Sequence, residues 1–144
     1  MAKKPSILFV CTGNSARSQI AEGFARYYGG EAIRVDSAGT APKGLNPNAV
    51  WVMNEAGIDI SSQTSDPLDS KKLKEFDIVI TLCGDARDHC PPLPAGIRSE
   101  HWDLADPARA RGKPLEILEA FRLTRFQVEK RVRELLGRMS AKEK

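Results

Sequence analysis

The sequence predicts an α/β fold, a three-layer sandwich around a central, mostly parallel four-stranded sheet. Two observations predict it. Short apolar runs alternate with segments whose apolar residues recur at helical spacing, and glycine or proline marks the boundaries of most of these segments. The 144 residues contain no internal repeat, low-complexity tract or linker. We therefore expect a single domain over residues 1–144.

The elements can be assigned in chain order. Ile7–Val10 is a compact apolar run, typical of a strand buried on both faces. The first helix follows a short turn, with apolar residues at helical spacing from Ile20 to Tyr28, and Gly29-Gly30 ends it. Further strands are expected at 32–37, 78–82 and 97–102. Further helices are expected from Pro47 to Gly57, from Asp69 to Leu73, and from Pro114 onward with a face of Leu118, Phe121, Val128, Val132 and Leu135.

Composition narrows the function. Hydrophobic residues make up 41% and charged residues 28% of the chain, as in ordinary globular proteins, and the net charge is +3. This charge is too weak and dispersed for a nucleic-acid partner, and no apolar run is long enough for a membrane span or a signal peptide. Three cysteines cannot complete a disulfide framework. We expect a cytoplasmic monomer with a small anionic substrate.

The strongest motif lies between the first strand and the first helix. It consists of Cys11, Thr12, Gly13, Asn14, Ser15, Ala16, Arg17 and Ser18. Such a loop can turn successive backbone N–H groups toward one anion, with the helix N-terminus behind them and the Arg17 fork beside them. These dipoles favour the thiolate of Cys11, and Ser18 is placed to donate to its sulfur. A lone cysteine here would indicate only a core residue, but the whole motif in this context favours a nucleophile.

This loop resembles the phosphate-binding loop of the low-molecular-weight protein tyrosine phosphatases. The wider sequence is similar to their relatives, the thioredoxin-coupled arsenate reductases. The similarity is carried by further blocks in the same order, namely Ser37–Gly39, Gly44–Ala49, Gly57–Ser61, Gln63–Asp66, Thr81–Ala86, Glu100–Trp102 and Asp106–Ala110. It implies reduction of arsenate in arsenic detoxification, with phosphate or sulfate as competing oxyanions and thioredoxin as the partner that recycles the enzyme.

The resemblance also implies that Asp106 is the general acid. An oxygen displaced by the thiolate leaves more easily once it is protonated. Asp106-Pro107 follows the last predicted strand, and the proline stiffens the segment that carries the carboxylate. Alone, Asp-Pro would indicate only a turn. Asp103 is the nearby competitor for the role.

The two distal cysteines match the reductase pattern. The resemblance implies a relay in which Cys83 attacks the Cys11 sulfur, arsenite leaves, and Cys90 then attacks Cys83. The alternatives are that both cysteines are incidental, or that they hold a metal together with His89, although no four-ligand zinc spacing is present. Many relatives carry a further cysteine just before the loop arginine; here that position is Ala16, so the loop contains no second thiol.

A potassium site is a further expectation. Asn14, Glu22, Ser37 and Asp66 match positions that hold potassium in some arsenate reductases, and oxygen ligands suit a hard cation. The alternative is a hydrogen-bond network among the same residues. No tightly bound cofactor is expected otherwise. His101 and Trp102 are expected to pack near the end of the sheet.

Two other functions remain open. A phosphotyrosine phosphatase would need Cys11, Arg17 and Asp106 but neither distal cysteine. No aromatic residue follows Asp106 before Ala110, whereas such phosphatases tend to carry a tyrosine pair there. A non-catalytic redox sensor or oxyanion-binding regulator would undergo thiol oxidation without turnover, and a full set of acid, nucleophile and arginine argues against it.

Overall fold

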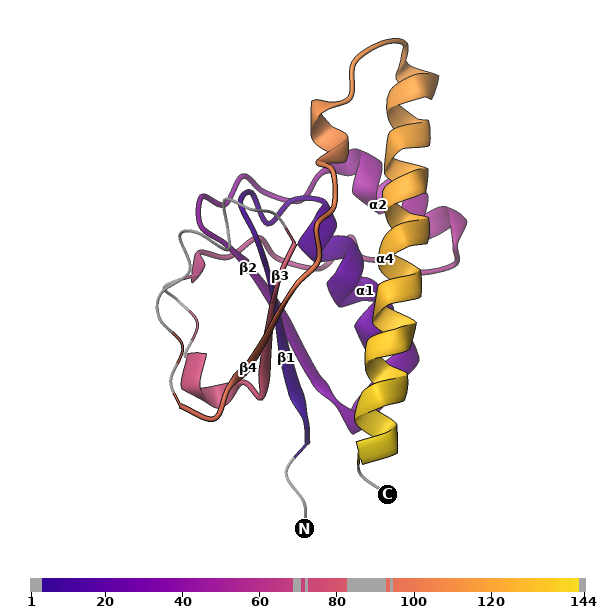
Figure 1. Cartoon of the computed structure of the whole chain (residues 1–144). Coiled ribbons are helices and arrows are strands. Elements are labelled where there is room, and N and C mark those ends of the chain that lie inside the picture. The colour runs from indigo at the N-terminus through magenta and orange to yellow at the C-terminus, as the bar shows by residue number, and fades with distance from the viewer. Residues whose placement is uncertain (1–3, 69–70, 72, 83–92, 94, 143–144) are drawn as a thin grey trace.

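Four parallel strands form the centre of the molecule (Figure 1). The computed structural model describes residues 4–68, 71, 73–82, 93 and 95–142. The strands are β1 (Ser6–Cys11), β2 (Arg34–Gly39), β3 (Ile78–Thr81) and β4 (Arg98–His101). They lie in the order β2-β1-β3-β4, and every neighbouring pair is parallel. The predicted four-stranded parallel sheet is therefore confirmed, with β1 at its centre.

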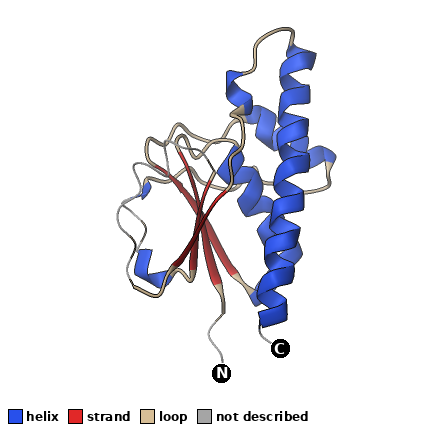
Figure 2. Ribbon diagram, in the orientation of Figure 1, coloured by secondary structure: helices blue, strands red, loops and turns tan. Residues whose placement is uncertain are grey.

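Both faces of the sheet are covered. Successive residues of a strand point to opposite faces, and Ile7 through Val10 of β1 are all fully buried. The helices α1 (Arg17–Gly29), α2 (Pro47–Glu55) and α4 (Pro114–Lys142) lie together on one side of the sheet (Figure 2). The segment carrying the short 3-10 helix η3 (Leu73–Glu75) lies on the other side. The three-layer α/β arrangement follows.

Helix boundaries follow the local chemistry that the sequence indicated. Gly30, with φ of 56°, caps the end of α1 in a conformation that favours glycine. Pro47 opens α2, and the side chain of Asn46 caps it by accepting from the Asn48 N–H at 2.8 Å. A short helix was also predicted from Asp69 to Leu73; Asp69 lies outside the described residues.

The long helix α4 packs along α1 and α2. The side chains of Phe121, Val128, Val132 and Leu135 are fully buried, which confirms the predicted apolar face, while Leu118 is half-buried. No helix within the described residues is both long enough and apolar enough to cross a membrane. The first turn of α4 follows η4 (Pro107–Arg109), which lies near the carboxyl end of the sheet.

Candidate active site

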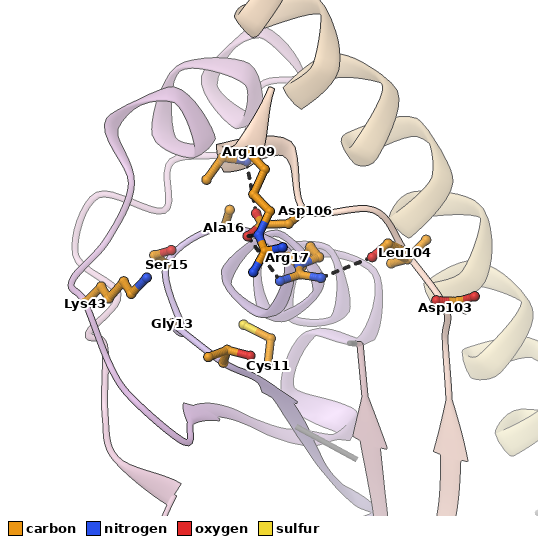
Figure 3. Close-up of a pocket in the computed structure, with 12 residues that line it drawn as sticks. Cys11, Gly13, Ser15, Ala16, Arg17, Lys43, Asp103, Leu104, Asp106 and Arg109 are labelled. Atoms are coloured by element: carbon orange, nitrogen blue, oxygen red, sulfur yellow. Dashed lines mark hydrogen bonds and ion pairs between the residues drawn. The ribbon is translucent and has the colours of Figure 1, made fainter. Parts of the chain in front are cut away.

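The nucleophile motif lies at the carboxyl end of the central strand. Cys11 is the last residue of β1, and Arg17 is the first residue of α1. The loop between them forms the floor of a cavity of about 630 Å³ (Figure 3). The cavity is lined by Cys11, Thr12, Gly13, Ser15, Ala16, Arg17, Lys43, Asp103, Leu104, Asp106, Ala108 and Arg109. The structure thus brings together Cys11, Arg17 and Asp106, although Asp106 is far from the other two in the sequence.

The backbone carbonyl of every loop residue from Cys11 to Ala16 accepts a hydrogen bond. Four of these carbonyls accept from backbone N–H groups of the segment after β2, at 2.8 to 3.2 Å. The acceptors are Cys11, Thr12, Gly13 and Ser15, and their donors are, in the same order, Thr40, Ala41, Lys43 and Asn46. The Asn14 carbonyl accepts from the Gln19 side chain at 2.9 Å, and the Ala16 carbonyl accepts from the Ile20 N–H at 2.8 Å. The loop is therefore held by its carbonyl oxygens.

This arrangement decides where the loop N–H groups point. All peptide bonds described are trans, and in a trans peptide the C=O of one residue and the N–H of the next point in opposite directions. Carbonyls turned toward the surrounding chain therefore turn the N–H groups of residues 12–17 toward the loop centre. Together with the positive end of α1, they form an anion-binding nest beside the Cys11 sulfur.

Hydrogen bonds also organise the nucleophile. The Cys11 Sγ and Ser18 Oγ atoms are 2.9 Å apart and buried. Ser18 Oγ accepts from Asn14 Nδ2 at 2.8 Å, so its own hydroxyl hydrogen is available to the sulfur. A Cys11 thiolate would accept that hydrogen, and a hydrogen bond to the charged form stabilises it. Ser18 is therefore a positioned donor, as the sequence predicted.

The four residues of the expected potassium site gather behind this serine. Asn14 Nδ2 donates to Ser37 Oγ at 2.9 Å, Ser37 donates to Glu22 at 2.6 Å, and Asn14 Oδ1 accepts from the Asp66 N–H at 2.8 Å. Asn14 adopts a φ of 44°, which this short polar side chain tolerates. The Glu22 carboxylate pairs with Arg26 at 2.8 Å, and Asp66 with Lys71 at 3.1 Å.

The arrangement therefore fits the hydrogen-bond network that the sequence left as the alternative. Arg26 and Lys71 already supply positive charge to its two carboxylates. Within the described part of the chain, no cluster of three or more His, Cys, Asp or Glu residues is arranged to hold a metal. Potassium at Asn14, Glu22, Ser37 and Asp66 stays a prediction.

Arg17 and Asp106 lie next to each other in the wall of the cavity. Arg17 is 8% exposed; its Nη1 donates to the Leu104 carbonyl at 3.1 Å, and its Nη2 lies 3.5 Å from Asp106 Oδ2. Asp106 caps η4 by accepting from the Ala108 N–H at 3.0 Å, and Arg109 Nε lies 3.9 Å from its carboxylate. The guanidinium is thus oriented before any ligand binds, and a carboxyl group is available above the loop.

His101 and Trp102 pack at the end of the sheet, as predicted. His101 Nδ1 and Thr81 Oγ1 are 2.8 Å apart, linking β4 to β3. Trp102 is buried, and its ring centroid lies 5.7 Å from that of Phe9. Neither residue lines the cavity.

Several residues of the site were not identified from the sequence. Lys43 and Arg109 line the cavity, Leu104 supplies a carbonyl to Arg17, and Ser65 donates to the Gly13 carbonyl at 3.3 Å. None of them belongs to a chemical motif with Cys11, because their contacts depend on how distant loops meet. Arg109 lies within the Asp106–Ala110 block that resembles the reductases.

The proposed relay cysteines, Cys83 and Cys90, lie outside the described residues. The N–H of Leu82 donates to the Val10 carbonyl at 2.9 Å. Val10 immediately precedes Cys11 and pairs with Thr81 in the sheet. Leu82 therefore lies beside the strand that carries the nucleophile.

Comparison with known proteins identifies relatives of the whole domain. The sequence model of the family described as "Low molecular weight phosphotyrosine protein phosphatase" matches residues 6–144. An arsenate reductase of Bacillus subtilis (strain 168) is 52% identical over 128 residues, covering 89% of this chain and 92% of that protein. The solved structure of an arsenate reductase in the phosphate binding state matches with a TM-score of 0.78 and 40% identity, covering 93% and 98% of the two chains. A thioredoxin-dependent arsenate reductase from Corynebacterium glutamicum matches with a TM-score of 0.76 and 30% identity, covering 98% of this chain and 64% of that one.

Proposed function

This chain belongs to the low molecular weight phosphotyrosine protein phosphatase family, and we propose that it is an arsenate reductase. The observation that carries the proposal is the loop whose carbonyls bind the surrounding chain, so that its N–H groups and Arg17 surround one oxyanion next to the Cys11 sulfur. A nest alone does not distinguish arsenate from phosphate. Relatives named arsenate reductases and the two further cysteines favour arsenate.

In the first step the Cys11 thiolate attacks arsenic. A sulfur–arsenic bond forms and one arsenic–oxygen bond breaks. The departing hydroxyl group of arsenate takes a proton from Asp106 and leaves as water. The loop N–H groups and Arg17 hold the remaining oxygens, whose negative charge persists through the step. This pairing needs the nucleophile and the acid on opposite sides of the bound anion, and both residues line the cavity.

In the second stage two electrons pass to arsenic. The Cys83 thiolate attacks the Cys11 sulfur, the sulfur–arsenic electron pair goes to arsenic, and arsenic(V) becomes arsenic(III), released as arsenite. A Cys11–Cys83 disulfide remains. Cys90 then attacks Cys83, which frees the Cys11 thiolate and leaves a Cys83–Cys90 disulfide for reduction by thioredoxin. The spacing of the three cysteines and the thioredoxin-dependent relative support this sequence.

Hydrolysis of a small aryl phosphate is a side activity that the same first step predicts. Phosphate has the shape and charge of arsenate, and Cys11, Arg17 and Asp106 serve both chemistries. The η4 segment contributes Ala108 and Arg109 to the cavity rather than aromatic side chains. We therefore expect phosphotyrosine peptides to be poor substrates.

The deciding experiment measures NADPH consumption with arsenate, thioredoxin and thioredoxin reductase. Wild type should consume NADPH only when arsenate is present, and Cys83→Ser and Cys90→Ser should lose multiple turnover. Both variants should still hydrolyse a small aryl phosphate slowly, whereas Cys11→Ser should lose both activities. If wild type consumed no NADPH in response to arsenate, and every protein except Cys11→Ser hydrolysed an aryl phosphate briskly, the chain would be a phosphatase.

Three lesser expectations accompany the proposal. A thioredoxin-driven cycle needs a reducing compartment, so we place the protein in the cytoplasm, acting as a monomer; light scattering tests the oligomeric state. Potassium bound by Asn14, Glu22, Ser37 and Asp66 would stabilise the loop. Replacing potassium by sodium at constant ionic strength should then lower turnover. Equal turnover in both salts would mean that these four residues form only a hydrogen-bond network and bind no potassium.

A further inference from the structure

Lys43 lies beside the loop that is proposed to bind the oxyanion. Its backbone N–H donates to the Gly13 carbonyl at 2.8 Å, which fastens this residue directly to the loop. A Cβ atom built on Gly13 would lie 3.5 Å from Lys43 Cδ, so the lysine stem packs within van der Waals range of the loop at Gly13. In Figure 3 the Lys43 side chain approaches the loop from the side opposite Asp106 and Arg109, with its ammonium end toward the cavity.

The charges around the cavity leave this lysine available. Three cations line the cavity, namely Arg17, Lys43 and Arg109, together with the carboxylates Asp103 and Asp106. Asp106 lies 3.5 Å from Arg17 and 3.9 Å from Arg109. Lys43 forms no ion pair with any residue in the described part of the chain. Among the described residues it is therefore the cation of this cavity whose charge no carboxylate offsets.

The reaction needs such a charge. A thiolate and a multiply charged oxyanion must share one cavity, and Asp106 adds negative charge on the side where the departing oxygen leaves. The nest and Arg17 offset part of this repulsion. A further ammonium on the Gly13 side would meet an oxygen that stays bound to arsenic or phosphorus.

We propose that Lys43 is a third anion ligand of the site, binding an oxygen of the oxyanion that remains through the first step. The inference deepens the proposed function and rests on it for the choice of arsenate. Because the oxygen it holds keeps its charge before and during the attack, Lys43 stabilises the bound substrate and the transition state alike. Such uniform binding lowers KM and leaves kcat unchanged.

The test begins with inorganic phosphate, whose binding requires no turnover. Isothermal titration calorimetry should show that Lys43→Gln binds phosphate about tenfold more weakly than wild type, on the scale of one charge-assisted hydrogen bond at a partly exposed site. Lys43→Arg should retain most of the affinity. The substitution keeps the backbone N–H that holds Gly13 and changes an exposed side chain, so we expect the fold to persist. Lys130→Gln is the matched control, since it removes the same charge from an exposed position on α4 outside the cavity.

The arsenate assay then separates the two proposals. KM for arsenate should rise about tenfold in Lys43→Gln, with kcat within twofold of wild type. Wild-type phosphate affinity in Lys43→Gln would overturn the inference, and so would an equal loss in Lys130→Gln, which would indicate only net charge. If wild type shows no arsenate-dependent turnover but Lys43→Gln still binds phosphate more weakly than wild type, the reductase proposal fails and the Lys43 site stands.

Discussion

Replacing Gly39 with alanine should damage the active-site loop through steric contact alone. Gly39 ends β2 and pairs in register with Cys11, and its N–H donates to the Asp66 carbonyl at 2.9 Å. An added Cβ would lie 2.6 Å from the Thr12 carbonyl oxygen and 2.9 Å from the backbone nitrogen of Asn14. Ordinary contacts begin near 3.4 Å, so one of these segments must retreat by about 0.8 Å.

Both stability and catalysis should register that displacement. Overpacking of this kind costs about 1–3 kcal/mol in free energy of unfolding. Because Thr12 and Asn14 belong to the nest, a shift approaching 1 Å should also lower kcat/KM for arsenate or an aryl phosphate by up to about 100-fold.

Urea unfolding and steady-state kinetics measure the two effects, with Gly137→Ala as the matched control. Gly137 lies inside α4, and no atom would lie within 4 Å of its added Cβ. That control should gain about 0.5–1 kcal/mol of stability, because alanine favours helix over glycine, and should keep wild-type activity. If Gly39→Ala unfolded at the wild-type urea midpoint with kcat/KM within twofold, close contact at Gly39 would not shape the loop.

Three further predictions concern other parts of the molecule. Asp106→Asn should lower kcat for aryl phosphate hydrolysis by about 10²- to 10⁴-fold while phosphate still binds. An unchanged kcat would indicate that Asp103 is the general acid. Hydrogen bonding from Arg122 lowers the pKa of Glu55 to about 2, below the value of about 4.3 for glutamate in the unfolded chain. The stabilisation by the Glu55 carboxylate is therefore complete above a pH of about 4.3 and is lost as the pH falls toward 2. Wild type and Glu55→Gln should accordingly differ in urea midpoint at pH 7 and converge in acid; a constant difference across that range would argue against this ion pair. Leu135→Ala should cost about 2–5 kcal/mol with KM for arsenate unchanged, and a smaller loss in thermal unfolding would mean that the α4 face repacks.

The sequence predicted those parts of the fold that short-range patterns determine. The apolar run at Ile7–Val10 and the helical spacing from Ile20 to Tyr28 indicate a strand and a helix, and the motif between them is local. The glycines and prolines at helix ends fall within one or two residues of the observed boundaries. The buried face of α4 follows from its 3.6-residue period. Sheet order was not assigned, because periodicity says nothing about which strands pair.

The parts of the site that the sequence did not predict are contacts between distant segments. Arg17 donates to the carbonyl of Leu104, 87 residues away, and any residue type can supply a carbonyl. Lys43 follows a proline in a loop, and only the folded chain brings it into contact with Gly13. Asp106 and Arg17 line one cavity, and the roles that the resemblance implied for them stay predictions. Cys83 and Cys90 lie outside the described residues, so the relay depends on its own experiment.

The carbonyls that hold the loop in place also couple the folding of this protein to its solutes. With those oxygens committed to the surrounding chain, the N–H groups of residues 12–17 converge on a site that exists only in the folded state. Any tetrahedral anion that binds there shifts the folding equilibrium toward the native state, by about 1.4 kcal/mol for each tenfold rise in its concentration above Kd. A melting temperature recorded in phosphate or sulfate buffer therefore measures the fold together with its ligand, and arsenate must displace whichever anion the medium already supplies.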